Sequence, residues 1–129
     1  MEAGIKHTER MTVSENDTAR AAGSGTLEVF ATPSMIALIE KTCYTAVAPY
    51  LEEGTTTVGT RLDVEHVSAT PVGMEVEASC TLTEVDGRRL VFEVEAKDAR
   101  GVIGRGTHER FIVRTASFVK KTYSKLKTE

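Results

Sequence analysis

Three polar residues, Thr32, Glu40 and His66, have side chains suited to nucleophilic or acid–base chemistry. Glu40 falls on a helix face that Ile36 and Cys43 make apolar, and His66 falls on the apolar side of a strand. A lone carboxylate on an apolar face costs several kcal/mol unless it is paired or protonated, and a shifted pKa suits a general acid or base. A threonine hydroxyl beside an imidazole can attack or orient a carbonyl group.

Each of the three residues also has a purely structural interpretation. Glu40 could pair with a buried arginine or reach the edge of its helix, and His66 could be a satisfied core histidine beside Val64. Thr32, which precedes Pro33, could simply cap a helix. Three such residues directed at one interior are harder to explain structurally than one, and a cleft at a subunit interface would explain them together.

The hydrophobic pattern predicts one long helix among strands. Apolar residues at helical spacing indicate a helix over 33–48, and Pro49 stands where it should end. Alternating patterns indicate strands, with a tight turn at "DGRR"; the expected strands are 5–14, 57–70, 72–86, 89–98 and 101–114. A single helix can be wrapped on one side by a curved sheet. The sequence therefore predicts an α+β fold with one central helix and about five antiparallel strands.

Composition places the chain among ordinary globular proteins. Its 129 residues fit one domain, 1–129, in which the lysine-rich segment 115–129 forms a C-terminal helix or a flexible basic tail. The net charge of −3 gives no reason to expect nucleic acid as a partner. The sequence has no run long enough to span a membrane and no apolar leader, so we expect a cytoplasmic protein.

The sequence offers no metal or nucleotide motif. Cys43 and Cys80 lack the spacing of metal ligands and are expected to be reduced core residues. No metal and no cofactor are therefore expected.

The segments "ATPSMIALIE", "GTRLDVEHVSATPVGMEV", "GRRLVFEVEAKD" and "IGRGTHERF" resemble the acyl-CoA thioesterases of the hotdog fold. The similarity covers 5–118 and points to the branch that includes fluoroacetyl-CoA thioesterase. The resemblance implies a homodimer with a continuous sheet and two sites at the subunit interface. It implies that Thr32, Glu40 and His66 are catalytic, and that Gly59 and Arg110 lie near the bound thioester.

Helix geometry separates two of the implied catalytic residues. Thr32 and Glu40 are eight residues apart, or about 12 Å along a helix axis, so they cannot touch directly. We expect Thr32 and His66 to lie near the thioester carbonyl, with Glu40 polarising His66 or a water. In the alternative arrangement, Glu40 is the base and Thr32 only positions the substrate.

The expected reaction is hydrolysis of a small or medium acyl-CoA to the free acid and CoA. The aromatic lid of the fluoroacetyl-specific enzyme has no clear counterpart, since Phe30 is the only aromatic residue in "AAGSGTLEVF". Basic residues should hold the CoA phosphates, with Arg88, Arg89, Arg105 and Lys121 as candidates. The alternatives are a non-catalytic acyl-CoA-binding protein, an enoyl-CoA hydratase or dehydratase, and a structural dimer without a ligand.

Overall fold

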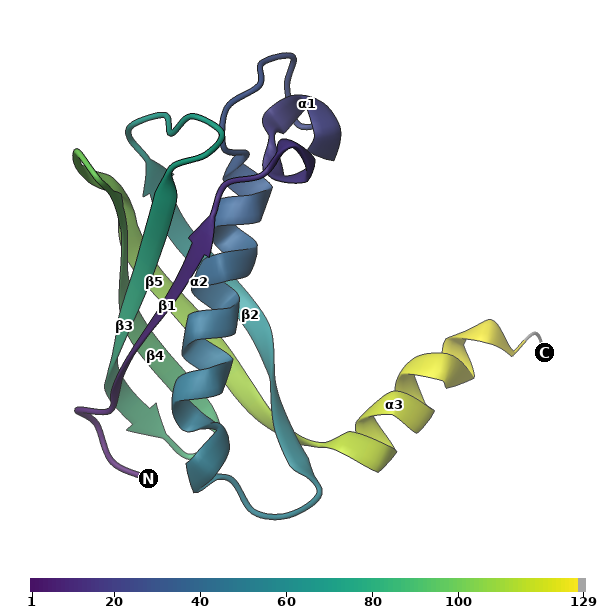
Figure 1. Ribbon diagram of the computed structural model, residues 1–129. Helices are drawn as coiled ribbons and strands as arrows, with labels where there is room; N and C mark the ends of the chain where they lie inside the picture. Colours follow the sequence, from purple (N-terminus) through teal and green to yellow (C-terminus); the bar gives the residue numbers. More distant parts are fainter. Residues whose placement is uncertain (128–129) are drawn as a thin grey trace.

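The computed structural model describes residues 1–127 and shows a long helix lying against one antiparallel sheet (Figure 1). The helix, α2, spans Thr32–Val47, and the strand order in the sheet is β1-β3-β4-β5-β2. The strands are β1 (Lys6–Thr12), β2 (Thr55–His66), β3 (Glu75–Asp86), β4 (Arg89–Asp98) and β5 (Gly101–Arg114). The predicted fold of one central helix and five strands is confirmed.

Short elements connect or extend this framework. The chain passes from β1 to α2 through η1 (Glu15–Asp17) and the one-turn helix α1 (Ala19–Ala22). A 3₁₀ turn, η2 (Ala48–Tyr50), follows α2 and contains Pro49, which lacks the N–H that a continuing helix needs. The chain continues after β5 into α3 (Thr115–Tyr123) and η3 (Ser124–Leu126).

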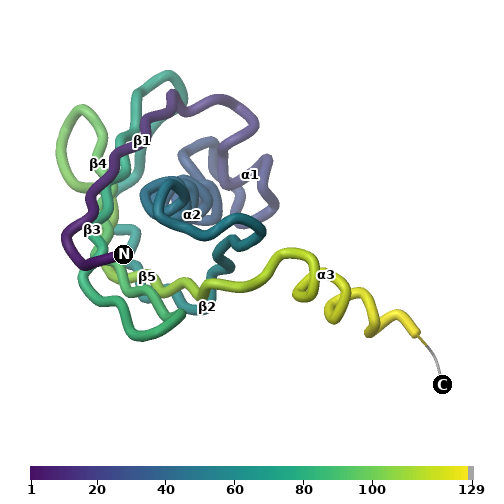
Figure 2. The backbone as a smooth tube through the Cα atoms, turned by 90° about the horizontal axis from the view of Figure 1, so that it is seen from below, coloured from purple at the N-terminus to yellow at the C-terminus, as the bar shows by residue number. Residues whose placement is uncertain are grey.

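The core lies between α2 and the inner face of the sheet, which curves around the helix when viewed along its axis (Figure 2). Met35 and Ile39 on α2 are fully buried, as are Leu82, Leu90 and Phe92 on the strands opposite. Full burial of such a side chain stabilises the fold by about 1.5–3 kcal/mol. Cys43 and Cys80 are free thiols within this core, as the sequence predicts.

Strand β2 departs from the predicted alternation. Its pairing with β5 shifts register between Gly59 and Arg61, so a bulge at Thr60 changes which residues face the helix. Thr57 is buried before the bulge, whereas Leu62 after it is 42% exposed. Leu62 pairs with the buried His108, so it lies on the inner face of the sheet together with His66. It is exposed because β2 is an edge strand.

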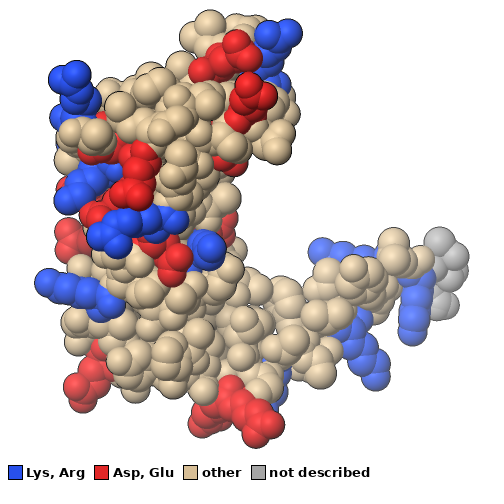
Figure 3. Space-filling view, in the orientation of Figure 1, with Lys and Arg blue, Asp and Glu red and all other residues tan. Residues whose placement is uncertain are grey.

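The C-terminal segment projects away from the body of the molecule (Figures 1 and 3). It is helical over Thr115–Tyr123, and none of its residues is buried. The end of the expected segment 115–129, residues 128 and 129, lies outside the described residues. No helix in the described part of the chain is long and apolar enough to cross a membrane.

Candidate active site

The structure brings Thr32 and His66 together at one end of the helix. The N-cap of α2 is Ala31, and Thr32 is the first helical residue, with Pro33 after it. The Thr32 hydroxyl is therefore not a cap, which removes the structural interpretation of this residue. Its Oγ1 lies 2.7 Å from Nδ1 of His66, the last residue of β2. This distance is that of a hydroxyl and base in hydrogen-bond contact.

His66 is placed to act as a neutral base. Burial lowers the pKa of its imidazole below the ordinary 6.5. Its Nε2 is buried and has no hydrogen-bond partner among the described residues. When Nδ1 accepts the Thr32 hydroxyl proton, the imidazole carries its own proton on Nε2.

A hollow of about 320 Å³ opens beside this pair. Thr32, His66 and Phe30 line it with small and apolar neighbours; the remaining lining residues are Ala19, Ser24, Val29, Val67, Ser68 and Ala69. No Asp, Glu, Lys or Arg side chain lines this hollow. Such a wall suits an uncharged group of small or moderate size.

Glu40 belongs to a second cluster, further along α2. Its Oε2 lies 3.2 Å from Nη1 of Arg110 and 4.0 Å from Nε2 of His108. The Glu40 side chain is 37% exposed, whereas Arg110 is 5% exposed. The structure thus shows the pairing of Glu40 with a buried arginine that the sequence left open as an alternative.

Arg110 is held rigidly by its neighbours. Its Nε donates to Thr57 Oγ1 over 2.8 Å, and its Nη2 donates to the Thr57 carbonyl over 3.0 Å. Its Nη1 also lies 3.1 Å from Nε2 of His108. A guanidinium fixed at all three nitrogens holds the Glu40 carboxylate in one position.

His108 is a residue of this cluster that the sequence analysis missed. Its Nδ1 donates to the Arg61 carbonyl over 2.8 Å, which leaves Nε2 free to accept from Arg110. Burial lowers the pKa of His108, in keeping with this neutral form. The sequence does contain a feature that could have identified His108. It lies two residues before Arg110 in "GTHER", so both side chains fall on one face of β5.

Gly59 makes room for the Glu40 carboxylate. A Cβ at this position would lie 2.6 Å from Glu40 Oε2 and 3.3 Å from both Arg110 Nη1 and His108 Cε1. Any larger residue would displace the carboxylate. Gly59 and Arg110, implied by resemblance to lie near the substrate, are thus brought into contact with Glu40.

The two clusters are separate within one protomer. Thr32 and Glu40 lie two helical turns apart, and the hydrogen bonds and ion pairs of Glu40 run to Arg110 and His108. The expected polarisation of His66 by Glu40 is not seen within one chain. Because β2 is an edge strand, both clusters border the side of the helix that the sheet leaves open.

A hydroxyl–imidazole pair beside an uncharged hollow, with a fixed carboxylate two turns further along the same helix, is an arrangement that suits a hotdog-fold thioesterase. Residues 13–116 match the family described as fluoroacetyl-CoA-specific thioesterase. The chain belongs to that family.

Individual relatives agree with this assignment. A fluoroacetyl-CoA thioesterase from Streptantibioticus cattleyicolor is 45% identical over 98 residues, which are 76% of this chain and 70% of that protein. A structure of a fluoroacetyl-CoA thioesterase superposes with a TM-score of 0.92 at 38% identity, covering 100% of this chain and 98% of the other. A hot-dog-like protein from Thermanaerovibrio acidaminovorans superposes with a TM-score of 0.90 at 25% identity, covering 100% and 96%.

Proposed function

We propose that this protein hydrolyses a small or medium acyl-CoA to the free acid and CoA. The observation that carries the proposal is the 2.7 Å contact between Thr32 Oγ1 and His66 Nδ1 beside an uncharged hollow. The similarity to thioesterases favours hydrolysis over simple binding and over hydration of an enoyl-CoA. No metal or cofactor is needed for the steps below.

Thr32 and His66 supply the first half of the reaction. The Thr32 Oγ attacks the thioester carbonyl carbon while His66 Nδ1 takes the hydroxyl proton. The C–S bond then breaks, and the CoA sulfur receives that proton from His66. The positive end of α2, at whose first residue Thr32 stands, favours the oxyanion that forms between these events.

Water completes the reaction. It attacks the carbonyl carbon of the acyl ester on Thr32 while the neutral His66 takes its proton. The acyl C–O bond to Thr32 then breaks, His66 returns the proton to Thr32 Oγ1, and the acid is released. Because Glu40 lies two helical turns from Thr32 in its own chain, we assign the orienting of this water to the partner's Glu40, which Arg110 fixes at the open side of the helix. In the alternative arrangement Glu40 activates a water that attacks the thioester directly, and no ester forms on Thr32. Trapping an acyl group on Thr32 by mass spectrometry distinguishes the two.

The active molecule in this proposal is a homodimer. Strand β2 is a 12-residue edge strand, and a free edge of this length offers unpaired backbone groups to another strand. Antiparallel pairing of two β2 strands would extend the sheet across both chains. It would also cover the open side of α2, so that each site is closed by the partner.

The acyl group is proposed to be small without selection for fluorine. Residues 21–28, which precede α2, are all exposed and contain no aromatic side chain. Phe30 is 1% exposed and packs in the core, so it does not form an outer lid. Acetyl-CoA and fluoroacetyl-CoA should therefore be hydrolysed with similar kcat/KM.

The test is release of free thiol from a panel of acyl-CoAs, from acetyl to octanoyl with fluoroacetyl and phenylacetyl. Wild type should release thiol, and His66→Ala, Thr32→Ala and Glu40→Gln should each lower kcat by about 10²–10⁴-fold, the usual contribution of a positioned acid or base. Glu53→Gln, a matched change at an exposed loop residue, should keep wild-type activity. Binding of acyl-CoA without thiol release would contradict hydrolysis and favour a binding protein.

A further inference from the structure

The C-terminal segment 115–126 is amphipathic, yet its apolar side is exposed. Its apolar residues recur at helical spacing, and all four are exposed: Phe118 by 41%, Val119 by 47%, Tyr123 by 66% and Leu126 by 77%. A helix this short is only marginally stable in water unless its apolar face is packed. The segment therefore needs a surface that its own protomer does not provide.

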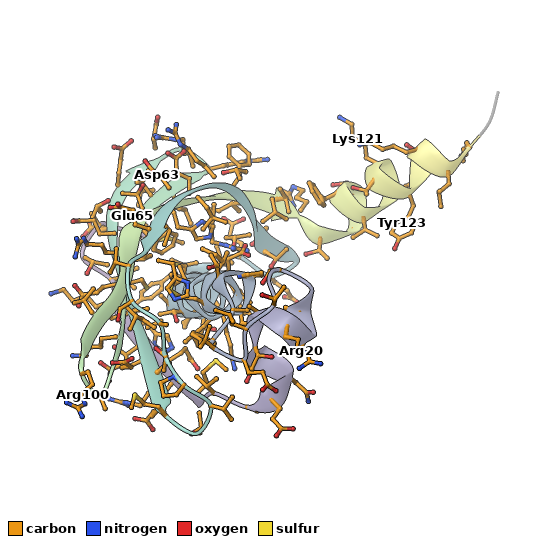
Figure 4. The ribbon with its side chains drawn as sticks, turned by 90° about the horizontal axis from the view of Figure 1, so that it is seen from above. Arg20, Asp63, Glu65, Arg100, Lys121 and Tyr123 are labelled. Atoms are coloured by element: carbon orange, nitrogen blue, oxygen red, sulfur yellow. The ribbon has the colours of Figure 1, made fainter. Side chains whose placement is uncertain are left out.

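The opposite side of the segment is strongly basic. It carries Lys120, Lys121 and Lys125, and residues 115–127 contain no acidic side chain, although the whole chain has a net charge of −3. Figure 4 shows Lys121 and Tyr123 on opposite sides of the projecting helix. Lysine side chains gather along this helix in the space-filling view (Figure 3). This charge suits a polyanionic ligand.

The segment leaves the body at the end of β2 opposite to His66. The last residue of β5, Arg114, pairs with Thr55 at the start of β2, and the Thr115 N–H donates to the Gly54 carbonyl over 3.0 Å. His66 is the last residue of the same strand. In an antiparallel pair of β2 strands, the start of one strand lies beside the end of the other. The C-terminal segment of one chain then emerges next to His66 of a second copy.

Other basic residues are less available for a phosphate. Arg89 is already paired with Glu84 and Glu109 at 2.8 and 3.0 Å. Arg105 lines a hollow that it shares with four carboxylates, Asp63, Glu65, Glu93 and Glu95. Figure 4 shows Asp63 and Glu65 on the outside of the sheet, away from α2. Arg88 lines a hollow that it shares with the Glu52 carboxylate and with Arg114, at the base of the C-terminal segment.

We infer that segment 115–126 crosses to the second copy, packs its apolar side beside the partner's Thr32–His66 pocket, and binds the CoA phosphates through Lys120 and Lys121. The inference rests on the proposed thioesterase function and its dimer. The substrate supplies the negative charge that the lysines match, and the acyl end enters the uncharged hollow. Each site then combines the nucleophile of one chain with the phosphate-binding lysines of the other.

The first test separates phosphate binding from chemistry. The double variant Lys120→Glu and Lys121→Glu should raise KM for acyl-CoA at least tenfold. It should leave kcat/KM unchanged for the acyl N-acetylcysteamine thioester, which lacks the phosphates. Lys6→Glu with Arg100→Glu changes the charge equally at exposed residues elsewhere and should behave as wild type. An unchanged KM would overturn the inference. If wild type hydrolysed neither thioester, the proposed function itself would fail.

The second test asks which chain supplies the lysines. Heterodimers are purified from differently tagged chains, one carrying His66→Ala and the other carrying Lys120→Glu with Lys121→Glu. If the lysines act across the dimer, one site contains both intact parts, and activity at low acyl-CoA should return to about half of wild type. If they act within their own chain, no complete site forms, and the absence of recovery would overturn the inference.

A third measurement tests whether the basic amphipathic helix binds an anionic membrane surface. Wild-type protein is sedimented with vesicles containing anionic lipid, with and without saturating CoA. We expect no binding to the vesicles. Vesicle binding that is lost in the Lys120→Glu and Lys121→Glu double variant, while its KM stays unchanged, would replace the inference with a membrane role.

Discussion

At the scale of single residues, the site depends on polar groups that hold one another in place. The Thr32 hydroxyl contacts His66 because the helix cap is formed by Ala31, and Glu40 is fixed because Arg110 is itself fixed by Thr57 and His108. Each contact limits a side chain that would otherwise sample several rotamers. Small changes next to these groups should therefore affect catalysis more than stability.

Gly59→Ala should inactivate the enzyme without unfolding it. The new Cβ would lie 2.6 Å from Glu40 Oε2, and that flexible carboxylate can move aside while the strand stays in place. We expect kcat to fall by about 100-fold, as for misplacement of a catalytic group, with a loss of less than about 1 kcal/mol in unfolding free energy. Thiol release measures kcat, and urea unfolding measures the unfolding free energy. Thr56→Ala on the same strand is the control for both. Full activity in Gly59→Ala would show that the Glu40 position is not critical.

The pH profile of kcat/KM should report His66. Burial lowers its pKa below 6.5, so the neutral, proton-accepting form persists into mildly acidic solution. The acid limb of the profile should therefore have its midpoint below pH 6.5. An acid limb centred above pH 6.5 would contradict the assignment of neutral His66 as the base.

At the scale of elements, α2 and β2 each serve both the core and the site. One side of α2 carries the fully buried Met35, Ile39 and Cys43, while Thr32 and Glu40 border the open side. The bulge at Thr60 lets β2 place Gly59 beside Glu40 and, further along, His66 beside Thr32. Leu62 shares this face with His66 and is exposed because β2 is the free edge of the sheet.

Leu62→Glu should weaken the proposed dimer while each chain stays folded. Leu62 is 42% exposed in the protomer, so a charge there costs little within one chain but is costly at a closed apolar interface. We expect the dimer dissociation constant to rise at least about tenfold, a loss of about 1.4 kcal/mol, and activity to become concentration-dependent. Analytical ultracentrifugation measures the dimer dissociation constant. Leu27→Glu, at another exposed leucine, is the control, and an unchanged dimer in Leu62→Glu would place the interface elsewhere.

At the scale of the whole molecule, stability should depend on two neutral histidines. Burial lowers the pKa of both His66 and His108 in the folded chain, whereas the unfolded chain titrates near 6.5. The unfolded state therefore binds protons first as pH falls, and stability present above pH 6.5 is lost below it. His108→Gln should lose less stability than wild type between pH 7.5 and 5. Equal losses in urea unfolding would remove His108 from this pH dependence.

The sequence by itself determined the fold class and its main elements. Helical spacing over 33–48 and alternation in β3 and β4 follow from which residues can face a common core, so these elements were predictable from short-range pattern. Thr32, Glu40 and His66 stood out for a related reason, since polar side chains interrupt those patterns. Cys43 and Cys80 were also predicted correctly as core thiols.

The tertiary structure decided which of these residues meet. The pattern could not show that the bulge at Thr60 puts Gly59 on the same face as Leu62 and His66, because the register of β2 is set by its pairing with β5. Nor could it show that Glu40 pairs with Arg110, 70 residues away, and not with His66. That Thr32 and His66 lie together was expected from the family resemblance and not from the pattern. Periodicity records which face a residue occupies, whereas contacts between distant residues depend on how the elements pack. The core could be predicted from the pattern, but the arrangement of the site could not.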